Sequence, residues 1–124
     1  MPHNWVFTLP IYPHVHWTTN GTNTAVVRWQ VSLITAPGHN RGNYGEDVPY
    51  TVEEAAHGTA WRAMVTEHAT GFTAPEIDSL VIIELKRIAN GGTDNTDRVF
   101  ANFVDLHYEI GQIATPSRVP DFFS

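Results

Sequence analysis

The stretch that decides the fold is residues 13–17, Pro-His-Val-His-Trp. Successive side chains of an extended strand point to opposite faces, so His14 and His16 share one face. Val15 and Trp17 then share the other face and are the better candidates for the protein interior. The stretch therefore predicts a strand with a polar, histidine-bearing outer side and an apolar inner side.

A second alternating stretch, residues 99–110, lies far along the sequence. Its polar face carries Asp105, His107 and Glu109. Its apolar face is made of Phe100, Val104, Leu106, Tyr108 and Ile110. If the two stretches are neighbours in one sheet, their polar faces form one surface and their apolar faces one side of a core, which is the arrangement that a sandwich requires.

The most regular alternation lies in residues 25–35. Apolar side chains occupy every second position there and polar ones lie between them, which is the pattern of a half-buried strand. The apolar set is Val27, Trp29, Val31 and Leu33, and the polar set is Arg28, Gln30 and Ser32. Residues 18–24 contain an Asn-Gly pair that favours tight turns, so we expect a hairpin between 14–17 and 25–35.

Residues 50–68 fit two interpretations. Thr51, with Glu54 three positions later, is typical of a helix N-terminus. Gly58 interrupts that run, however. After it, Trp61, Ala63 and Val65 alternate with Arg62, Met64 and Thr66. A strand over residues 59–68 is therefore preferred.

Residues 75–89 present a similar conflict. Their apolar positions fit helical spacing, but residues 80–85 form a compact run rich in β-branched side chains, as in a buried strand. Residues 90–97 are rich in Gly, Asn and Asp and predict a short turn. Such a turn suits a hairpin into a strand over 98–110, which favours a strand for 79–89.

Together these segments predict a single all-β domain over residues 13–114, a β-sandwich or jelly roll of about five to eight short strands. Residues 1–12 are expected to form an extended N-terminal arm and residues 115–124 a C-terminal tail, both too apolar to remain in water. Residues 36–49 predict a long polar loop. The side chains expected at subunit interfaces are Trp5, Phe7, Tyr44, Phe122 and Phe123.

The composition argues against several classes of protein. The formal net charge is -6, with 7 Lys and Arg, which argues against nucleic-acid and anionic-membrane partners. There are no cysteines, so disulfides and thiolate metal sites are impossible. No stretch reaches the roughly 20 apolar residues of a membrane span, and the first residues lack the pattern of a signal peptide. Charged residues make up only 16% of the chain, which is typical of a surface partly covered by another subunit.

The histidine-bearing faces are the strongest candidates for chemistry. Three imidazoles and a carboxylate could ligate zinc, iron or manganese, the residues being His14, His16, His107 and Glu109. The same stretch repeated around a three-fold axis could hold a metal between subunits. Histidines spaced along a strand are nevertheless more often hydrogen-bonded partners than ligands. We therefore predict a polar network that includes Asp105, with no metal, no cofactor and no catalytic residue.

On a jelly-roll scaffold, a His-x-His stretch also resembles the cupins, in which two histidines, a glutamate and a further histidine hold a metal. Cupins place the glutamate a few residues after the histidines, whereas residues 17–21 contain none. Cupin ligands also point into the barrel. In this chain Val15 and Trp17, and not the histidines, are expected to face the interior. A cupin-like metal-dependent enzyme is kept as an alternative.

Three stretches taken together resemble a group of small tailed-bacteriophage virion proteins. They are residues 13–17 (PHVHW), 26–31 (VVRWQV) and 104–110 (VDLHYEI). The likeness extends over residues 12–114 and implies a β-sandwich in the particle shell or its attachments, without enzymatic activity. It also implies a strand for residues 79–89.

The resemblance implies a function in the virion, as a decoration or cement protein that stabilises a phage head. The expected partners are other virion proteins, above all the major capsid protein, and further copies of the same chain, with a trimer as one candidate. The alternative is a neck, tail or fibre protein with a receptor or attachment role, which would bind host cells through residues 36–49.

Overall fold

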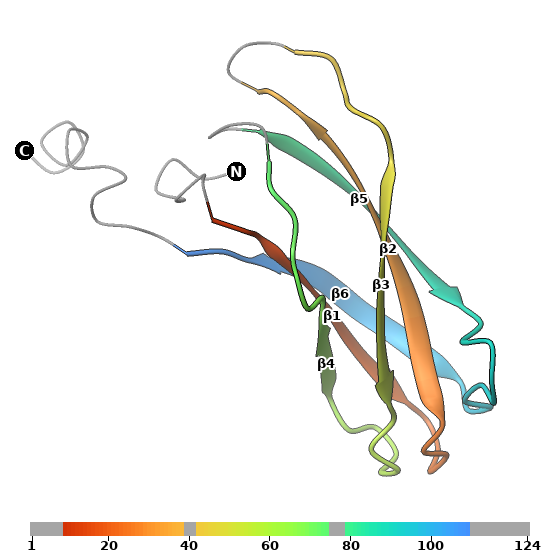
Figure 1. Ribbon diagram of the computed structural model, residues 1–124. Helices are drawn as coiled ribbons and strands as arrows, with labels where there is room; N and C mark the ends of the chain where they lie inside the picture. The colour runs from red at the N-terminus through yellow and green to blue at the C-terminus, as the bar shows by residue number, and fades with distance from the viewer. Residues whose placement is uncertain (1–8, 39–41, 75–78, 110–124) are drawn as a thin grey trace, which may run out of the picture.

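The computed structural model describes residues 9–38, 42–74 and 79–109. They form two packed three-stranded antiparallel sheets, which confirms the predicted all-β sandwich (Figure 1). The predicted tail and most of the predicted arm lie outside the described residues, and so do Trp5, Phe7, Phe122 and Phe123. No described segment is a helix long and apolar enough to cross a membrane.

Six strands build the two layers. Sheet A has the order β4-β1-β6, with β4 at Met64–Glu67, β1 at Tyr12–Thr19 and β6 at Val99–His107. Sheet B has the order β3-β2-β5, with β3 at Val48–Ala55, β2 at Val26–Ala36 and β5 at Leu80–Ile88. The two most regularly alternating stretches, β1 and β2, are thus the central strands of their sheets.

The core lies between the sheets, on the inner faces of β1 and β2. Val15 and Trp17 are fully buried, as their place in the alternation predicted. The rings of Trp17 and Trp29 approach each other across the two layers, with their centroids 6.5 Å apart. Trp17 Nε1 donates a hydrogen bond of 2.9 Å to Thr66 Oγ1, which in turn donates to a carboxylate oxygen of Glu54. The single polar atom of the buried indole is therefore satisfied.

The sandwich begins before residue 13. Ile11 is fully buried and exchanges two backbone hydrogen bonds with Phe72, of 2.7 and 2.8 Å. Tyr12 is the first residue of β1. These two residues, which the sequence assigned to the arm, therefore belong to the sandwich.

Strands β1 and β6 are paired antiparallel neighbours, as the two alternating stretches predicted. His14 lies opposite Asp105 and Val15 lies opposite Val104, so polar meets polar and apolar meets apolar. This pairing creates the histidine-bearing outer face of sheet A and, behind it, one wall of the core.

A bulge corrects one part of that prediction. The register of β1 against β6 shifts between His16 and Trp17. Such a shift changes the face that the β6 side chains on the far side of the bulge occupy. Phe100 therefore lies opposite Thr18 and is 42% exposed. The expectation that Phe100 lies in the core is wrong.

Neither predicted hairpin forms. Strands β1 and β2 lie in different sheets, and so do β5 and β6, so each connecting turn carries the chain across the sandwich. Among the connections between the six strands, only β2–β3 joins neighbours of one sheet. The other consecutive strands lie in opposite layers, so their apolar faces meet across the core instead of lying side by side.

The ambiguous residues 50–68 are extended only near their two ends, in β3 and β4. The helix considered at Thr51 is absent, since Val52 is buried between exposed neighbours as in a strand. The strand expected over 59–68 is shortened because Gly58 and Trp61 adopt positive φ angles of 86° and 63° and turn the chain. The strand preferred over 79–89 is confirmed by β5.

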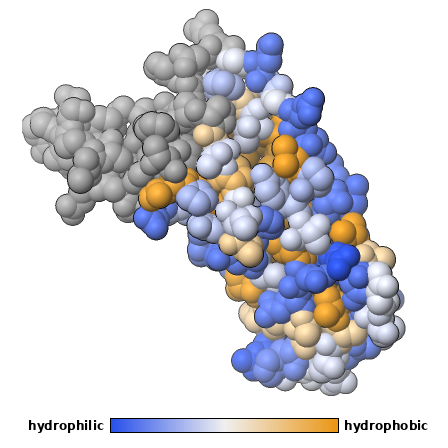
Figure 2. Space-filling model, viewed as in Figure 1, coloured by the Kyte–Doolittle hydropathy of each residue, from blue (hydrophilic) through white to orange (hydrophobic). Residues whose placement is uncertain are grey.

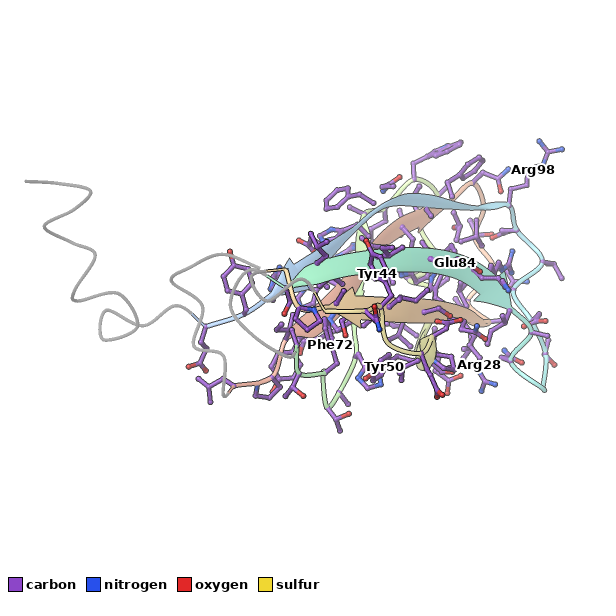
Figure 3. The ribbon with its side chains drawn as sticks, turned by 90° about the horizontal axis from the view of Figure 1, so that it is seen from above. Arg28, Tyr44, Tyr50, Phe72, Glu84 and Arg98 are labelled. Atoms are coloured by element: carbon purple, nitrogen blue, oxygen red, sulfur yellow. The ribbon has the colours of Figure 1, made fainter. Side chains whose placement is uncertain are left out.

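One end of the sandwich is held by a buried asparagine. Asn95 Nδ2 donates to the carbonyl oxygens of Asn23 and Ala25, both at 3.0 Å, and its Oδ1 accepts from the Asp97 amide at 2.9 Å. Figure 3 shows the neighbouring Arg98 at this end of the molecule and Phe72 toward the other. Asn95 thus links the loop that follows β1 to the loop that precedes β6.

Candidate functional site on the outer face of sheet A

His14 lies at the centre of the outer face of sheet A because β1 is the middle strand. Glu67 of β4 lies opposite it on one side and Asp105 of β6 on the other. His16 is two residues along β1 and His107 two residues along β6, so both share this face. Strand order and alternation therefore bring three imidazoles and two carboxylates together.

His14 is the buried member of this group, with 8% of the residue exposed. Its Nε2 contacts Glu67 Oε2, and its ring lies against that of His107, with the centroids 3.5 Å apart. Its second nitrogen, Nδ1, is buried and has no hydrogen-bond partner among the described residues. Leaving such an atom unpaired costs about 1–3 kcal/mol of folding free energy. A ligand bound to Nδ1 would remove this cost.

The carboxylate of Asp105 is hydrogen-bonded to both His16 and His107. Its two carboxylate oxygens each lie 3.2 Å from an imidazole Nε2, one from His16 and the other from His107. The His16 ring stacks on Phe103, with centroids 4.0 Å apart and planes 19° apart. The predicted polar network of histidines and Asp105 is therefore formed, and its rings are held in place by packing as well as by hydrogen bonds.

An aromatic strip continues this face, defined by Trp61, Phe100 and Phe103. Trp61 is 65% exposed and Phe103 54% exposed, and Trp61 stacks on Phe100 with centroids 5.6 Å apart. Val65 of β4, opposite His16, is exposed beside the strip. On the face shown in Figure 2, by contrast, hydrophobic residues lie in separate groups among hydrophilic ones.

Trp61 is held in an unusual backbone conformation. Its φ of 63° lies in the left-handed region, which costs a bulky residue about 1–3 kcal/mol. Its amide donates to the Thr19 carbonyl at 2.7 Å, and Thr18 Oγ1 donates to the Arg62 carbonyl at 2.8 Å. Hydrogen bonds to the end of β1 thus fix a strained turn that presents an exposed tryptophan.

The predicted site residues are only partly brought together. His14, His16 and His107 converge, whereas Glu109 follows the end of β6 and belongs to neither group of converging ligand atoms among the described residues. Glu67 occupies the carboxylate position that was expected for Glu109. In β4, Thr66 is buried while Val65 and Glu67 are exposed, which is the reverse of what the apolar alternation of Trp61 and Val65 in the sequence indicates. The antiparallel pairing of β4 with β1 was not predicted either.

The histidines do not have the orientation of cupin ligands. His14 and His16 lie on the outer face of sheet A, and the interior behind them is filled by Val15 and Trp17. Tyr44, the described interface candidate of the loop after β2, is exposed and has no part in this face. Comparisons with protein-family models, curated proteins and solved structures found no match to this chain.

His68, which follows β4, is a described histidine whose surroundings shift its pKa. Partial burial lowers its pKa from the ordinary value of 6.5 because desolvation disfavours the charged ring. Its Nδ1 accepts a hydrogen bond of 3.0 Å from the Gly71 amide, which requires that nitrogen to be unprotonated. The ring also meets Tyr50 edge-on, with centroids 4.9 Å apart.

The free energy of unfolding is expected to decrease as the pH falls, and protonation of His68 contributes to this decrease. Because its pKa is lower in the folded than in the unfolded chain, the unfolded chain binds more protons as the pH falls below 6.5. The contribution of neutral His68 is thus complete above that value and is lost below it. Urea unfolding between about pH 7.5 and pH 5 should show a weaker pH dependence in His68→Gln than in the wild type. The exposed His57→Gln is the control, and an equal pH dependence in His68→Gln and wild type would contradict the assignment.

Proposed function

We propose that this protein is a non-enzymatic structural component of a bacteriophage virion, acting as a decoration or cement protein on the capsid. The observation that carries the proposal is the aromatic strip, three large side chains exposed together on one sheet face. Aromatic side chains are enriched at the centres of protein interfaces, and contiguous exposed apolar surface marks interaction sites. We infer that another virion protein, or another copy of this chain, covers the strip.

The resemblance to phage virion proteins supports the same function. Its three stretches fall on β1, β2 and β6. Strands β1 and β2 are central in their sheets, and β6 pairs with β1 along the histidine-bearing face. The resemblance therefore rests on residues that build the sandwich and its outer face.

A decoration protein needs a large surface area buried against its partner and does not need a catalytic site. A stable interface buries about 800 Å² on each partner, with an apolar centre and a polar rim. Trp61, Phe100 and Phe103 supply the apolar centre on this surface. The strained turn at Trp61 supports this interpretation, because backbone strain persists where a side chain must be held in a set position.

Single replacements in the strip are expected to weaken attachment without unfolding the domain. Trp61→Ser and Phe103→Ser should each reduce binding to phage heads assembled without the protein by about 30-fold, the effect of losing an interface hot spot of about 2 kcal/mol. Their unfolding free energies should stay within about 0.5 kcal/mol of wild type, as for exposed positions generally. Co-sedimentation with the heads measures the binding, and light scattering measures the oligomeric state.

Tyr44→Ser is the matched control, since it removes an exposed aromatic residue from a different surface. If this variant loses binding and the strip variants keep it, the loop is the contact and the proposal is wrong. A parallel pull-down with host cells distinguishes the attachment role. Binding to cells but not to heads would replace the decoration function with a receptor-binding one.

A further inference from the structure

We propose that the outer face of sheet A binds one divalent transition-metal ion of the zinc class through His14, His16 and Asp105. One ligand atom from each of these residues lies within 4.8 Å of the others. His14 and His16 come from alternate positions of β1, and Asp105 lies directly opposite His14 on β6. The three donors therefore project from two hydrogen-bonded strands of one rigid sheet.

The donor set suits zinc chemistry. Two imidazoles and a carboxylate are a common set of three protein ligands for zinc, with a fourth position left for water or another group. At Zn–N and Zn–O distances of about 2.0–2.2 Å, tetrahedral ligand atoms lie about 3.3 Å apart. His16 Nε2 and Asp105 Oδ1 are already 3.2 Å apart. The ligand atom of His14 lies within 4.8 Å of this pair and would have to move closer to complete the site.

The unpaired nitrogen of His14 is the second observation. His14 is more than nine-tenths buried, and its Nε2 is committed to Glu67. Its Nδ1 has no hydrogen-bond partner among the described residues, so it carries a lone pair or a proton that nothing in this part of the chain satisfies. Ligation of a cation through Nδ1 would remove that deficit.

The surrounding residues form an outer shell of the kind that orients metal ligands. Glu67 accepts from His14 Nε2, the usual arrangement in which a ligating histidine donates its other ring N–H to a carboxylate. His107 Nε2 donates to the second oxygen of Asp105 at 3.2 Å. Phe103 stacks on His16. The two carboxylates also give the cluster two negative charges to offset a divalent cation.

A second set of ligand atoms, from His14, Glu67 and His107, also converges within 4.8 Å. In this set His14 Nε2 and Glu67 already contact each other, and binding through Nε2 would leave Nδ1 without a partner among the described residues. Glu67 and His107 are also exposed, whereas His16 and Asp105 are partly buried. The geometry therefore favours the first set, with the second acting as its outer shell.

Titration of the full chain, purified without a histidine tag, with Zn²⁺ in a calorimeter tests the site. We expect saturation at one ion per chain, and visible absorption bands of tetrahedral coordination when Co²⁺ replaces zinc. Zn²⁺ at a hundred times its Kd should raise Tm by about 10 °C. Ca²⁺ and Mg²⁺ should not compete, because both prefer oxygen ligands.

The variants separate the two sets of ligands. His16→Gln and Asp105→Asn should weaken zinc binding by more than about 100-fold, whereas Glu67→Gln and His107→Gln should weaken it by about 10–100-fold, as outer-shell partners do. Circular dichroism checks that each variant is folded, and His57→Gln, outside the cluster, should bind as wild type. Lack of saturable binding would overturn the proposal, and so would a reversed order in which Glu67→Gln and His107→Gln lose the most.

Discussion

Replacing Trp17 with alanine is expected to lower the free energy of unfolding by about 3–5 kcal/mol, the usual cost of removing a buried large aromatic side chain. The ring is fully buried and packs toward Trp29 of the opposite sheet. Both central strands are held by a neighbour on each side, so the backbone around the cavity can collapse only partly. A loss of this size is a large part of the total stability of a small domain and should lower Tm by roughly 12–20 °C.

Two variants show which part of the tryptophan matters. Trp17→Phe keeps most of the ring but removes the donor to Thr66, so it should cost clearly less than the alanine variant. Trp61→Ala removes the same side chain from an exposed position and should change stability by no more than about 0.5 kcal/mol. Urea unfolding followed by tryptophan fluorescence measures all three. Equal losses for Trp17→Ala and Trp61→Ala would contradict the described core.

Asn95→Ala is expected to cost about 3 kcal/mol, although Asn95 is a loop residue. Its side chain makes three hydrogen bonds, to the carbonyl groups of Asn23 and Ala25 and from the amide of Asp97. Each partner left unsatisfied costs about 1–3 kcal/mol, and the low end applies because these bonds are only partly buried. The loops at this end of the sandwich should also become more susceptible to proteolysis.

Asn95→Asp and Asn102→Ala are the comparisons. Aspartate keeps the acceptor for the Asp97 amide but places a carboxylate against two carbonyl oxygens, so it should be no better than alanine. Asn102 is an exposed asparagine of β6, and its replacement should be nearly neutral. An Asn95→Ala variant as stable as Asn102→Ala would show that the loops hold together without this side chain.

Alternation predicted the strands and their faces because it is a local property. Val15 and Trp17 are buried and His14 and His16 lie on the opposite face, as period two requires. The pairing of β1 with β6 followed from matching two such patterns. The same alternation places His14, His16, His107 and Asp105 on one surface.

Apart from the pairing of β1 with β6, the neighbours of each strand could not be predicted. An Asn-Gly turn suits both a hairpin and a crossing between sheets, so the partners of β1 and β2 were assigned wrongly. The bulge after His16 leaves no mark in the alternation of β1, and it moved Phe100 from the core to the surface. Glu67 was missed because its place beside His14 exists only once β4 pairs with β1.

The pairing of β1 has a consequence for the timing of folding. Its partners are distant in sequence: Glu67 is 53 positions after His14, and Asp105 is 89 positions after His16. At a translation rate of about 5–20 residues per second, β1 waits roughly 4–18 seconds before β6 has been synthesised. One edge of β1 stays unpaired until β4 has been synthesised and the other until β6 has, and such free strand edges favour chaperone binding and aggregation of nascent chains. The histidine-bearing face and the aromatic strip are therefore complete only once β6 has been synthesised and has paired with β1, so binding through them must follow that step.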